Sequence, residues 1–204
     1  IDGKPLRQIR DENIDIPLDD RVRMVMQLAS ALSAIHALDL IHRDVKPDNI
    51  MVTSDWQIKL TDFSIVQVPD SELTGDFDLV GTPAYLAPES FQSPKVDHRA
   101  DIFSLGTIAY ELLTGETPFS GDSISQYSYL IRHSRPREPR KIDPTLPLQL
   151  QDILGRMLKK SRRDRYQSAD ELVADLEQYF EDQADTMSSR IASFVSLFRD
   201  KDWS

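Results

Sequence analysis

The stretch IHRDVKPDN (residues 41–49) separates two regions whose apolar residues are regularly spaced. Before it, apolar residues within 18–40 recur at steps of three and four, which predicts a helix with one buried face. After it, the short runs 49–53 and 57–61 are separated by Ser-Asp-Trp and predict a small β-hairpin. Because a tight hairpin brings its two ends together, we expect the polar residues that flank it to lie close to one another.

The rest of the chain is predicted to be helical around one buried helix. Residues 99–114 are apolar nearly all round and stop at Gly115, as expected of a central helix. Further helices are predicted over 123–133, 147–160 and 168–182, the last of which opens with the capping box Ser-Ala-Asp-Glu. The predicted fold class is therefore mainly α, a helical bundle around a buried central helix with a small β-hairpin.

Composition excludes several classes of protein. The chain has 204 residues, which fits one domain, and its formal net charge of -10 argues against a nucleic-acid-binding protein, because phosphates are repelled over most of the surface. It has no Cys, which excludes disulfides, thiolate catalysis and Cys-ligated metals and fits a reducing compartment, so we expect a cytoplasmic location. No stretch approaches the ~18 apolar residues of a membrane span, so none is expected.

Two further segments follow the hairpin. Asp62-Phe63-Ser64 comes directly after it, and GTPAYLAPE occupies residues 81–89. Together with IHRDVKPDN they resemble the H-R-D, D-F-G and A-P-E signatures of protein kinases. The Lys two residues after the H-R-D Asp, and the Gly-Thr before A-P-E, resemble the serine/threonine class. The run RDRYQSADEL (163–172) is similar to bacterial kinases of eukaryotic type. The resemblance implies the C-terminal lobe of the kinase fold, with the hairpin carrying the catalytic loop.

The resemblance implies transfer of the ATP γ-phosphoryl group to Ser or Thr hydroxyls of a protein substrate. Asp44 stands at the position of the catalytic base, and Lys46 at that of the cation that offsets charge on the transferring phosphate. Asn49 and Asp62 correspond to ligands of Mg²⁺, with Mn²⁺ as an alternative, because amide and carboxylate oxygens suit hard cations. The other implied positions are the ATP-binding residues Ile1, Leu6 and Met51, and Thr82, which docks the target Ser or Thr.

The resemblance also implies structural positions. Asp101 corresponds to the residue that anchors the backbone of the catalytic loop. Arg165 corresponds to the residue that pairs with the Glu of Ala-Pro-Glu, here Glu89. His42 and Phe63 correspond to two members of the apolar stack that links the two lobes of a kinase.

Arg43, directly before the catalytic Asp, implies control by phosphorylation. A phosphate on the segment after the hairpin would pair with this Arg and order the segment. The candidate acceptors are Ser71 and Thr74. The segment also holds several acidic residues, which leaves open that these substitute in part for the phosphate or that the segment is a plain loop.

One residue departs from the family pattern, because Ser64 stands where the family has Gly. Gly tolerates backbone angles that cost other residues ~1–2 kcal/mol. We therefore expect Ser64 to restrict how Asp62 and Phe63 rearrange, without removing a catalytic atom.

A larger departure is that the glycine-rich loop, strand Lys and helix Glu that protein kinases place over the nucleotide do not occur in the sequence. We therefore expect residues 1–182 to be a C-terminal lobe that starts at the hinge, with an N-terminal kinase lobe as its partner. We also expect the chain alone to transfer phosphate poorly. Residues 183–204 are expected to be a tail with an extra amphipathic helix, for which packing on the lobe, partner binding and membrane contact all stay open.

Two other functions fit part of the pattern. A pseudokinase that serves as a binding scaffold would be expected to lack one of the four catalytic and metal-binding residues, and all four are present. A small-molecule kinase of the aminoglycoside or choline type would not need the docking segment GTPAYLAPE.

The basic pairs at 159–160 and 162–163 are expected to form a solvated helix end.

Overall fold

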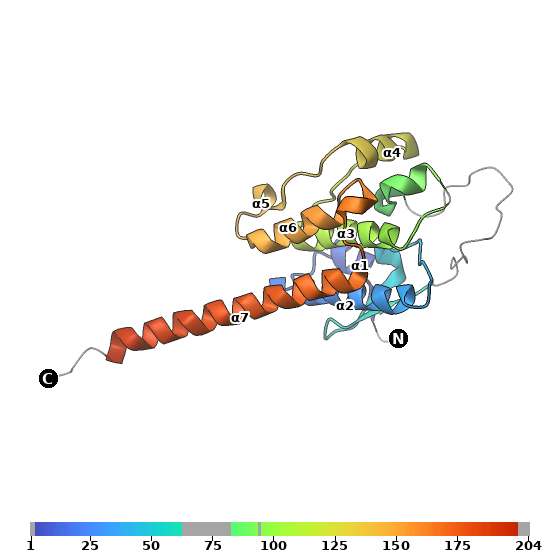
Figure 1. Cartoon of the computed structure of the whole chain (residues 1–204). Coiled ribbons are helices and arrows are strands. Elements are labelled where there is room, and N and C mark those ends of the chain that lie inside the picture. Colours follow the sequence, from blue (N-terminus) through green and yellow to red (C-terminus); the bar gives the residue numbers. More distant parts are fainter. Residues whose placement is uncertain (1–2, 63–82, 94, 200–204) are drawn as a thin grey trace.

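The computed structural model describes residues 3–62, 83–93 and 95–199, with side chains described up to residue 189. Its helices form a body from which the last helix projects (Figure 1). The helices are α1 (Leu6–Asp11), α2 (Leu18–His36), α3 (Arg99–Thr114), α4 (Ile124–His133), α5 (Pro139–Ile142), α6 (Leu148–Met157) and α7 (Ala169–Arg199). Single 3₁₀ turns are η1 (Pro47–Asn49), η2 (Pro83–Tyr85), η3 (Pro88–Phe91) and η4 (Arg162–Asp164). The strands are β1 (Lys4–Pro5), β2 (Ile50–Val52) and β3 (Ile58–Leu60).

Helix α3 is the centre of the core, with the bounds that its sequence predicts. Every residue from Ala100 to Glu111 is buried. The helix ends where Gly115 adopts a φ of 74° and donates its N–H to the Glu111 carbonyl at 2.9 Å, a left-handed cap that Gly adopts without strain. Helices α2 and α6 pack on either side of α3 (Figure 1). Gly106 permits the approach of α6, because a Cβ there would lie 2.8 Å from the Cβ of Met157.

The predicted hairpin is confirmed. Strands β2 and β3 are antiparallel, with Ile50 opposite Leu60, and β1 pairs with the outer edge of β2. The side chain of Gln27 on α2 holds the hairpin tip, because its Oε1 accepts from Ile58 N at 2.9 Å and its Nε2 donates to Trp56 O at 3.2 Å. Strand β1 was not predicted, since two residues carry no periodic signal. The hairpin is thus fixed between a helix and an added edge strand.

Helix α2 ends four residues earlier than predicted. Its last residue is His36, and the chain then turns through Asp39, which has a φ of 56°. The amide of Leu40 donates to the Ile35 carbonyl at 3.3 Å and closes the turn. Ala37 and Leu38 continue the apolar spacing past the end of the helix but are exposed in this turn, so the spacing alone does not distinguish the turn from helix.

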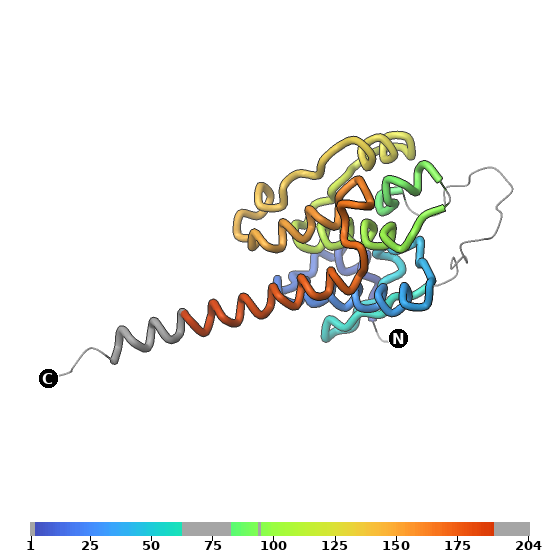
Figure 2. The backbone as a smooth tube through the Cα atoms, viewed as in Figure 1, coloured from blue at the N-terminus to red at the C-terminus, as the bar shows by residue number. Residues whose placement is uncertain are grey.

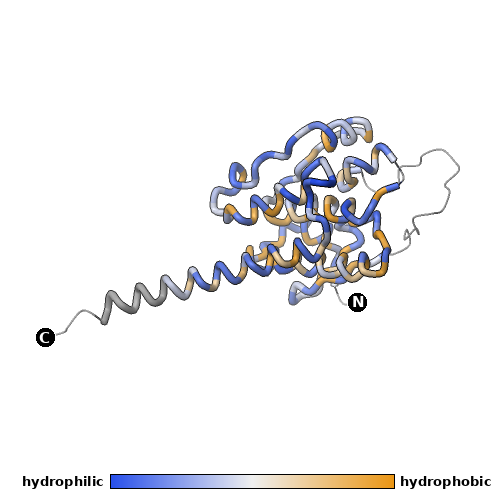
Figure 3. Tube along the Cα trace, viewed as in Figure 1, coloured by the Kyte–Doolittle hydropathy of each residue, from blue (hydrophilic) through white to orange (hydrophobic). Residues whose placement is uncertain are grey.

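Helix α7 begins with the predicted capping box in altered form. Glu171 N donates to Ser168 Oγ at 3.2 Å, and the Glu171 carboxylate accepts from Gln167 N at 3.0 Å. The helix then continues without a break to Arg199, so residues 183–199 extend α7 rather than form a separate tail helix. Figure 3 shows apolar residues concentrated in the body and the projecting helix mixed in character.

The basic residues before α7 are not all solvated, contrary to expectation. Lys159 and Arg163 are exposed, but Lys160 Nζ is buried 3.9 Å from the centroid of the Phe119 ring and has no hydrogen-bond partner among the described residues. Burial, and next the nearby charge of Arg165, lower the pKa of Lys160 to about 8. The apolar slot formed by aromatic side chains of the core thus holds an amine that water does not reach.

This burial predicts a pH dependence of stability. Because the pKa of Lys160 lies near 8 in the folded chain and near 10.5 when unfolded, the unfolded chain binds more protons between these values. The free energy of unfolding should therefore gain a contribution as pH rises from 8 to 10.5, fully present only above the unfolded pKa. Lys160→Met should remove that contribution, while the matched control Lys159→Met, at an exposed position, should keep it. Denaturant unfolding across this range checks the prediction, and equal pH profiles of the two variants would contradict it.

Candidate active site

Asp44, Lys46 and Asn49 converge where the loop 41–49 enters the hairpin. Asp44 Oδ2 accepts from Lys46 Nζ at 2.6 Å and from Asn49 Nδ2 at 3.0 Å, and Asn49 Nδ2 also donates to the Asp44 carbonyl at 2.9 Å. The turn η1 makes this possible, because Asn49 N donates to Lys46 O at 3.0 Å and folds the chain back. The Asp44 side chain is 10% exposed. Within the described part, its Oδ1 and the Asn49 amide oxygen accept no hydrogen bond.

The hairpin brings Asp62 to the same end as Asn49, as predicted from its two short strands. Thr61, directly before Asp62, donates both its N–H and its Oγ1–H to the Asn49 carbonyl, at 2.8 and 3.1 Å. Asp62 itself is exposed and has a φ of 58°, a left-handed conformation that costs a non-Gly residue ~1–2 kcal/mol. The backbone therefore turns sharply at this residue and leaves its carboxylate in solvent.

Asp101, on α3, holds the backbone of the loop 41–49. It is 1% exposed, and its two carboxylate oxygens accept from Arg43 N at 2.8 Å and from His42 N at 2.9 Å. Arg43 has a φ of 66°, so these bonds hold a strained residue directly before Asp44. A third contact, from His36 Nε2 to Asp101 Oδ2 at 2.9 Å, was not predicted. Nothing in the sequence signals it, because the two residues are 65 positions apart.

His42 is completely buried behind the loop. Its Nε2 lies 3.3 Å from the carbonyl oxygen of Thr61, so the ring bridges the loop 41–49 and the strand that leads to Asp62. The two halves of the candidate site are therefore connected through one side chain as well as through the hairpin.

Glu89 and Arg165 form a buried bidentate ion pair, with oxygen–nitrogen distances of 2.7 and 2.6 Å. The Arg165 side chain is 0% exposed. Its remaining donors reach the carbonyl oxygens of Arg99, Lys159 and Lys160 at 2.7 to 3.0 Å, so all five N–H groups of the guanidinium are used. The segment that ends in Ala-Pro-Glu is thus bonded to the chain directly before α7.

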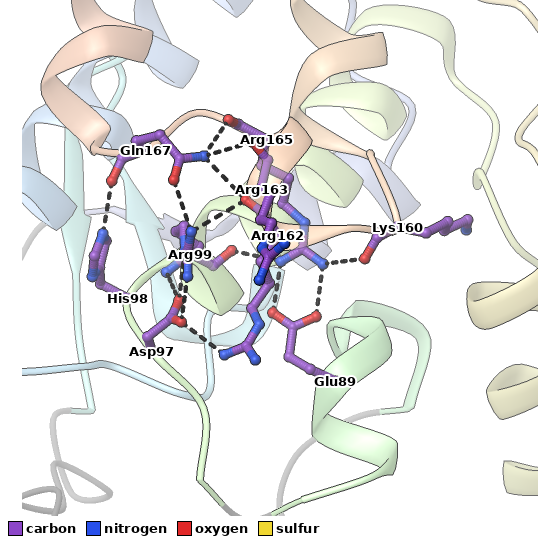
Figure 4. A network of polar contacts seen from close by, with 9 residues as sticks. All are labelled: Glu89, Asp97, His98, Arg99, Lys160, Arg162, Arg163, Arg165 and Gln167. Atoms are coloured by element: carbon purple, nitrogen blue, oxygen red, sulfur yellow. Dashed lines mark hydrogen bonds and ion pairs between the residues drawn. The ribbon is translucent and has the colours of Figure 1, made fainter.

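A second set of polar contacts surrounds this ion pair (Figure 4). Asp97 accepts from Arg99 and from Arg162 Nη1 at 2.7 Å, while Arg99 Nη1 donates to Gln167 Oε1 at 2.7 Å. Burial raises the pKa of Asp97, but the hydrogen bonds from Arg99 outweigh it and hold that pKa at about 2. His98 Nε2 also contacts Gln167 O at 2.8 Å. Hydrogen bonds and an ion pair therefore connect the start of α3 to η4 and to the residues directly before α7.

The two described residues expected to contact ATP are Met51 on β2 and Leu6, which begins α1 directly after β1. Met51 is half-buried and pairs with Pro5, which directly precedes Leu6. Leu6 is 3% exposed and lines a cavity of about 290 Å³ between α1 and α3. No nucleotide contact is implied by this burial alone, so their role stays a prediction.

A polar cluster that the sequence did not indicate lies beside this cavity. The Tyr85 hydroxyl lies 3.0 Å from Glu111 Oε2, and Arg10 Nη1 lies 3.2 Å from that hydroxyl and 3.3 Å from the same carboxylate. Burial raises the pKa of Glu111, an effect that the Tyr85 and Arg10 contacts oppose. The cluster joins α1, η2 and α3, which are distant in the sequence.

Several predicted site residues lie outside the described residues: Ile1, Phe63, Ser64, Ser71, Thr74 and Thr82. Their expected roles in nucleotide binding, lobe linkage, regulation and substrate docking stay predictions.

The described residues contain no group of three His, Asp or Glu side chains that converges as a metal site. Among the described residues, the Asn49 amide and the Asp62 carboxylate offer oxygen atoms at this end of the hairpin. Mg²⁺ is commonly held by one or two protein carboxylates together with water and substrate phosphates, so this donor set fits it.

Among the residues that the structure describes, no helix has the length and apolar character to cross a membrane.

Comparison with known proteins agrees with this geometry. The sequence model of the protein kinase domain matches residues 1–177. A probable serine/threonine-protein kinase of Clostridium perfringens is 35% identical over 201 residues, which are 97% of this chain and 29% of that protein. The serine/threonine-protein kinase PknL of Mycobacterium tuberculosis is 37% identical over 186 residues, 90% of this chain and 46% of that protein. The serine/threonine-protein kinase PknB of Mycobacterium leprae is 36% identical over 178 residues, which are 86% of this chain and 29% of that protein. The chain spans less than half the length of these relatives.

Proposed function

Because the chain belongs to the protein kinase family, we propose that it acts as the large lobe of a serine/threonine kinase of the eukaryotic-like type found in bacteria. The proposed reaction transfers the γ-phosphoryl group of ATP to a Ser or Thr hydroxyl of a protein. The observation that carries this proposal is the convergence of Asp44, Lys46 and Asn49 at the hairpin end from which Asp62 emerges.

In the proposed reaction, the substrate hydroxyl oxygen bonds to the γ-phosphorus while the bond from that phosphorus to the bridging oxygen breaks, which yields a phosphoester and ADP. The Asp44 carboxylate accepts the hydroxyl proton. The Asn49 amide orients this carboxylate through Oδ2, which leaves Oδ1 for the substrate. Lys46, 2.6 Å from Oδ2, places a positive charge where the transferring group passes.

Mg²⁺ bound here would neutralise charge on the nucleotide phosphates. The Asn49 nitrogen is committed to Asp44, so the amide oxygen is the atom that it offers to a metal. The exposed Asp62 carboxylate is the second proposed ligand. We propose that the remaining phosphate contacts come from an N-terminal kinase lobe, since the glycine-rich loop and strand Lys of the family do not occur in these residues.

A transfer assay on the full-length protein with γ-labelled ATP tests the function. Label is expected on Ser and Thr of a generic protein substrate, with none transferred after removal of divalent metal. Asp62→Asn should raise the Mg²⁺ concentration for half-maximal rate by at least about tenfold, because a metal ligand loses its charge. The matched control Asp55→Asn, at the opposite end of the same hairpin, should leave it unchanged.

The outcomes separate this proposal from a pseudokinase scaffold. Nucleotide binding without any transfer to protein would support the scaffold and contradict the kinase. Equal Mg²⁺ dependence of the Asp62→Asn and Asp55→Asn variants would contradict the metal assignment while leaving the reaction standing.

A further inference from the structure

The cavity between α1 and α3 adjoins the candidate active site but is separate from it. Its wall is formed by α1, residues 13–16, the start of α2, η1 and the end of α3, all of which belong to the body rather than to the projecting helix (Figure 2). The four residues of the candidate active site lie outside this wall, although Pro47 of η1 belongs to it. The volume, about 290 Å³, is close to the lower end of the range of small-molecule sites, roughly 300–1,000 Å³.

Most of the wall is apolar and leads from the core to the surface. Leu6, Ile9 and Ile108 are buried, whereas Leu112 is half-buried and Ile14 is exposed. An apolar group that enters the cavity is therefore removed from water against a wall that the fold has already formed, which is typical of a site for a small molecule.

The acidic side chains of the wall need no ligand. Glu111 is buried, and both of its carboxylate oxygens accept from the Tyr85 hydroxyl, at 3.3 and 3.0 Å, while Arg10 Nη1 lies 3.3 Å from Oε2. Asp15, the other acid, is exposed to water. Arg10 is paired as well, with Glu111 and with Asp11.

Arg21 is the exception among the charged residues of the wall. It is half-buried and, within the described residues, forms no ion pair and donates only from Nη1, to the Leu112 and Leu113 carbonyls at 3.1 and 3.5 Å. These distances lie at and beyond the long end of the usual range of about 2.7–3.2 Å. Its Nε is buried and has no hydrogen-bond partner in the same part of the chain. The guanidinium thus has donors that the described fold does not use.

We propose that this cavity binds a small molecule with an apolar body and one carboxylate, and that the carboxylate pairs with Arg21. An aromatic or branched aliphatic monocarboxylic acid has this chemistry. The apolar wall takes the body, and the planar guanidinium suits a carboxylate because it donates two parallel hydrogen bonds. The site is detected by binding alone, so it does not depend on the proposed phosphoryl transfer.

A cationic ligand is the main alternative, because the Glu111 carboxylate stands in the same wall. Burial raises the pKa of Glu111, and the contacts from Tyr85 and Arg10 oppose this rise. A ligand cation at this carboxylate would lie next to the Arg10 guanidinium and be repelled by it. A ligand anion at Arg21 meets a cation that has no counter-charge, which favours the acid.

Titrations of the full-length protein at pH 7, followed by saturation-transfer NMR of the ligand, test the proposal. The probes are 4-phenylbutyrate, 4-phenylbutanol and 4-phenylbutylamine, which share one ring and chain and differ in charge. We expect the acid to bind at least about tenfold more tightly than the alcohol or the amine, because only the acid pairs with Arg21.

Two variants on the same helix locate the charge. Arg21→Gln should weaken binding of the acid to the level of the alcohol and leave binding of the alcohol unchanged, which shows at once that the cavity is still formed. Arg23→Gln is the matched control, since Arg23 lies outside the wall and over the Phe180 ring. It should change neither affinity. Leu112→Trp, which fills the cavity from its half-buried edge, should abolish binding of both probes.

Four results would overturn the proposal. The first is equal binding of acid and alcohol, and the second is tighter binding of the amine, which would assign the cavity to a cation. The third is an equal effect of Arg21→Gln and Arg23→Gln on binding of the acid. The fourth is tighter binding of a peptide that ends in a free phenylalanine carboxylate than of 4-phenylbutyrate, which would assign the carboxylate to a protein terminus.

Discussion

The Asp44→Asn variant of the full-length protein is expected to lose about 10²- to 10⁴-fold in kcat, the range that a positioned general base contributes. Asn keeps the shape of the side chain and an oxygen that accepts from Lys46 and Asn49, which lie 2.6 and 3.0 Å from Asp44 Oδ2. It cannot take up the hydroxyl proton. The variant should therefore fold, bind nucleotide with little change in KM and transfer phosphate very slowly.

Asp48→Asn provides the matched control for this prediction. Asp48 lies in the same loop, but its side chain is 40% exposed and pairs with Arg7 at the surface. The control should keep its kcat within about twofold, since exposed ion pairs contribute little. Steady-state kinetics with a protein substrate provide the measurement, with thermal denaturation of both variants beside it. Similar kcat values for Asp44→Asn and Asp48→Asn would refute Asp44 as the base.

Arg165→Met is expected to lower the free energy of unfolding by about 3–5 kcal/mol, because it leaves a buried partner without its counter-charge. Glu89 would lose both of its short bonds, and the carbonyls of Arg99, Lys159 and Lys160 would each lose a donor. Denaturant unfolding of the full chain measures the change. The double variant Glu89→Leu/Arg165→Met should recover part of the loss, since it removes the lone carboxylate but leaves the three carbonyls unpaired.

Arg137→Met is the control for the buried pair. Arg137 pairs with Glu116 at 3.4 Å where both side chains are about half exposed, so its loss should cost ~1 kcal/mol or less. If the two Arg variants lost similar amounts, burial would not be what makes the Glu89–Arg165 pair strong.

Predictions from the sequence succeed where an element's structure depends only on residues that are neighbours in the sequence. Helix α3 has the predicted bounds because its apolar residues and the Gly115 cap lie within one short segment. The prediction of the hairpin is confirmed for the same reason. Helix α7 is longer than predicted because residues 183–199 contain no residue that stops a helix. The point at which the helix ceases to pack on the body has no signal in the local sequence.

The candidate site was predicted residue by residue through its motifs, but its supports were not. His36 meets Asp101, and Arg10 meets Glu111, across separations of 65 and 101 positions that only packing brings together. Lys160 shows the opposite case. Its basic neighbours and its place after a helix predict solvation, yet the rings of Phe103 and Phe119 enclose it.

The sequence alone therefore determined the family, the mainly helical class, and which residues are candidates for the chemistry, because these depend on side-chain type and spacing along the chain. Only the tertiary structure decided how Asp101 holds the loop that contains the strained Arg43, which of the described charges are buried with a partner and which without, and where α7 leaves the body. Burial and pairing depend on what surrounds a residue in space, and that environment is assembled from segments that carry no signal of one another.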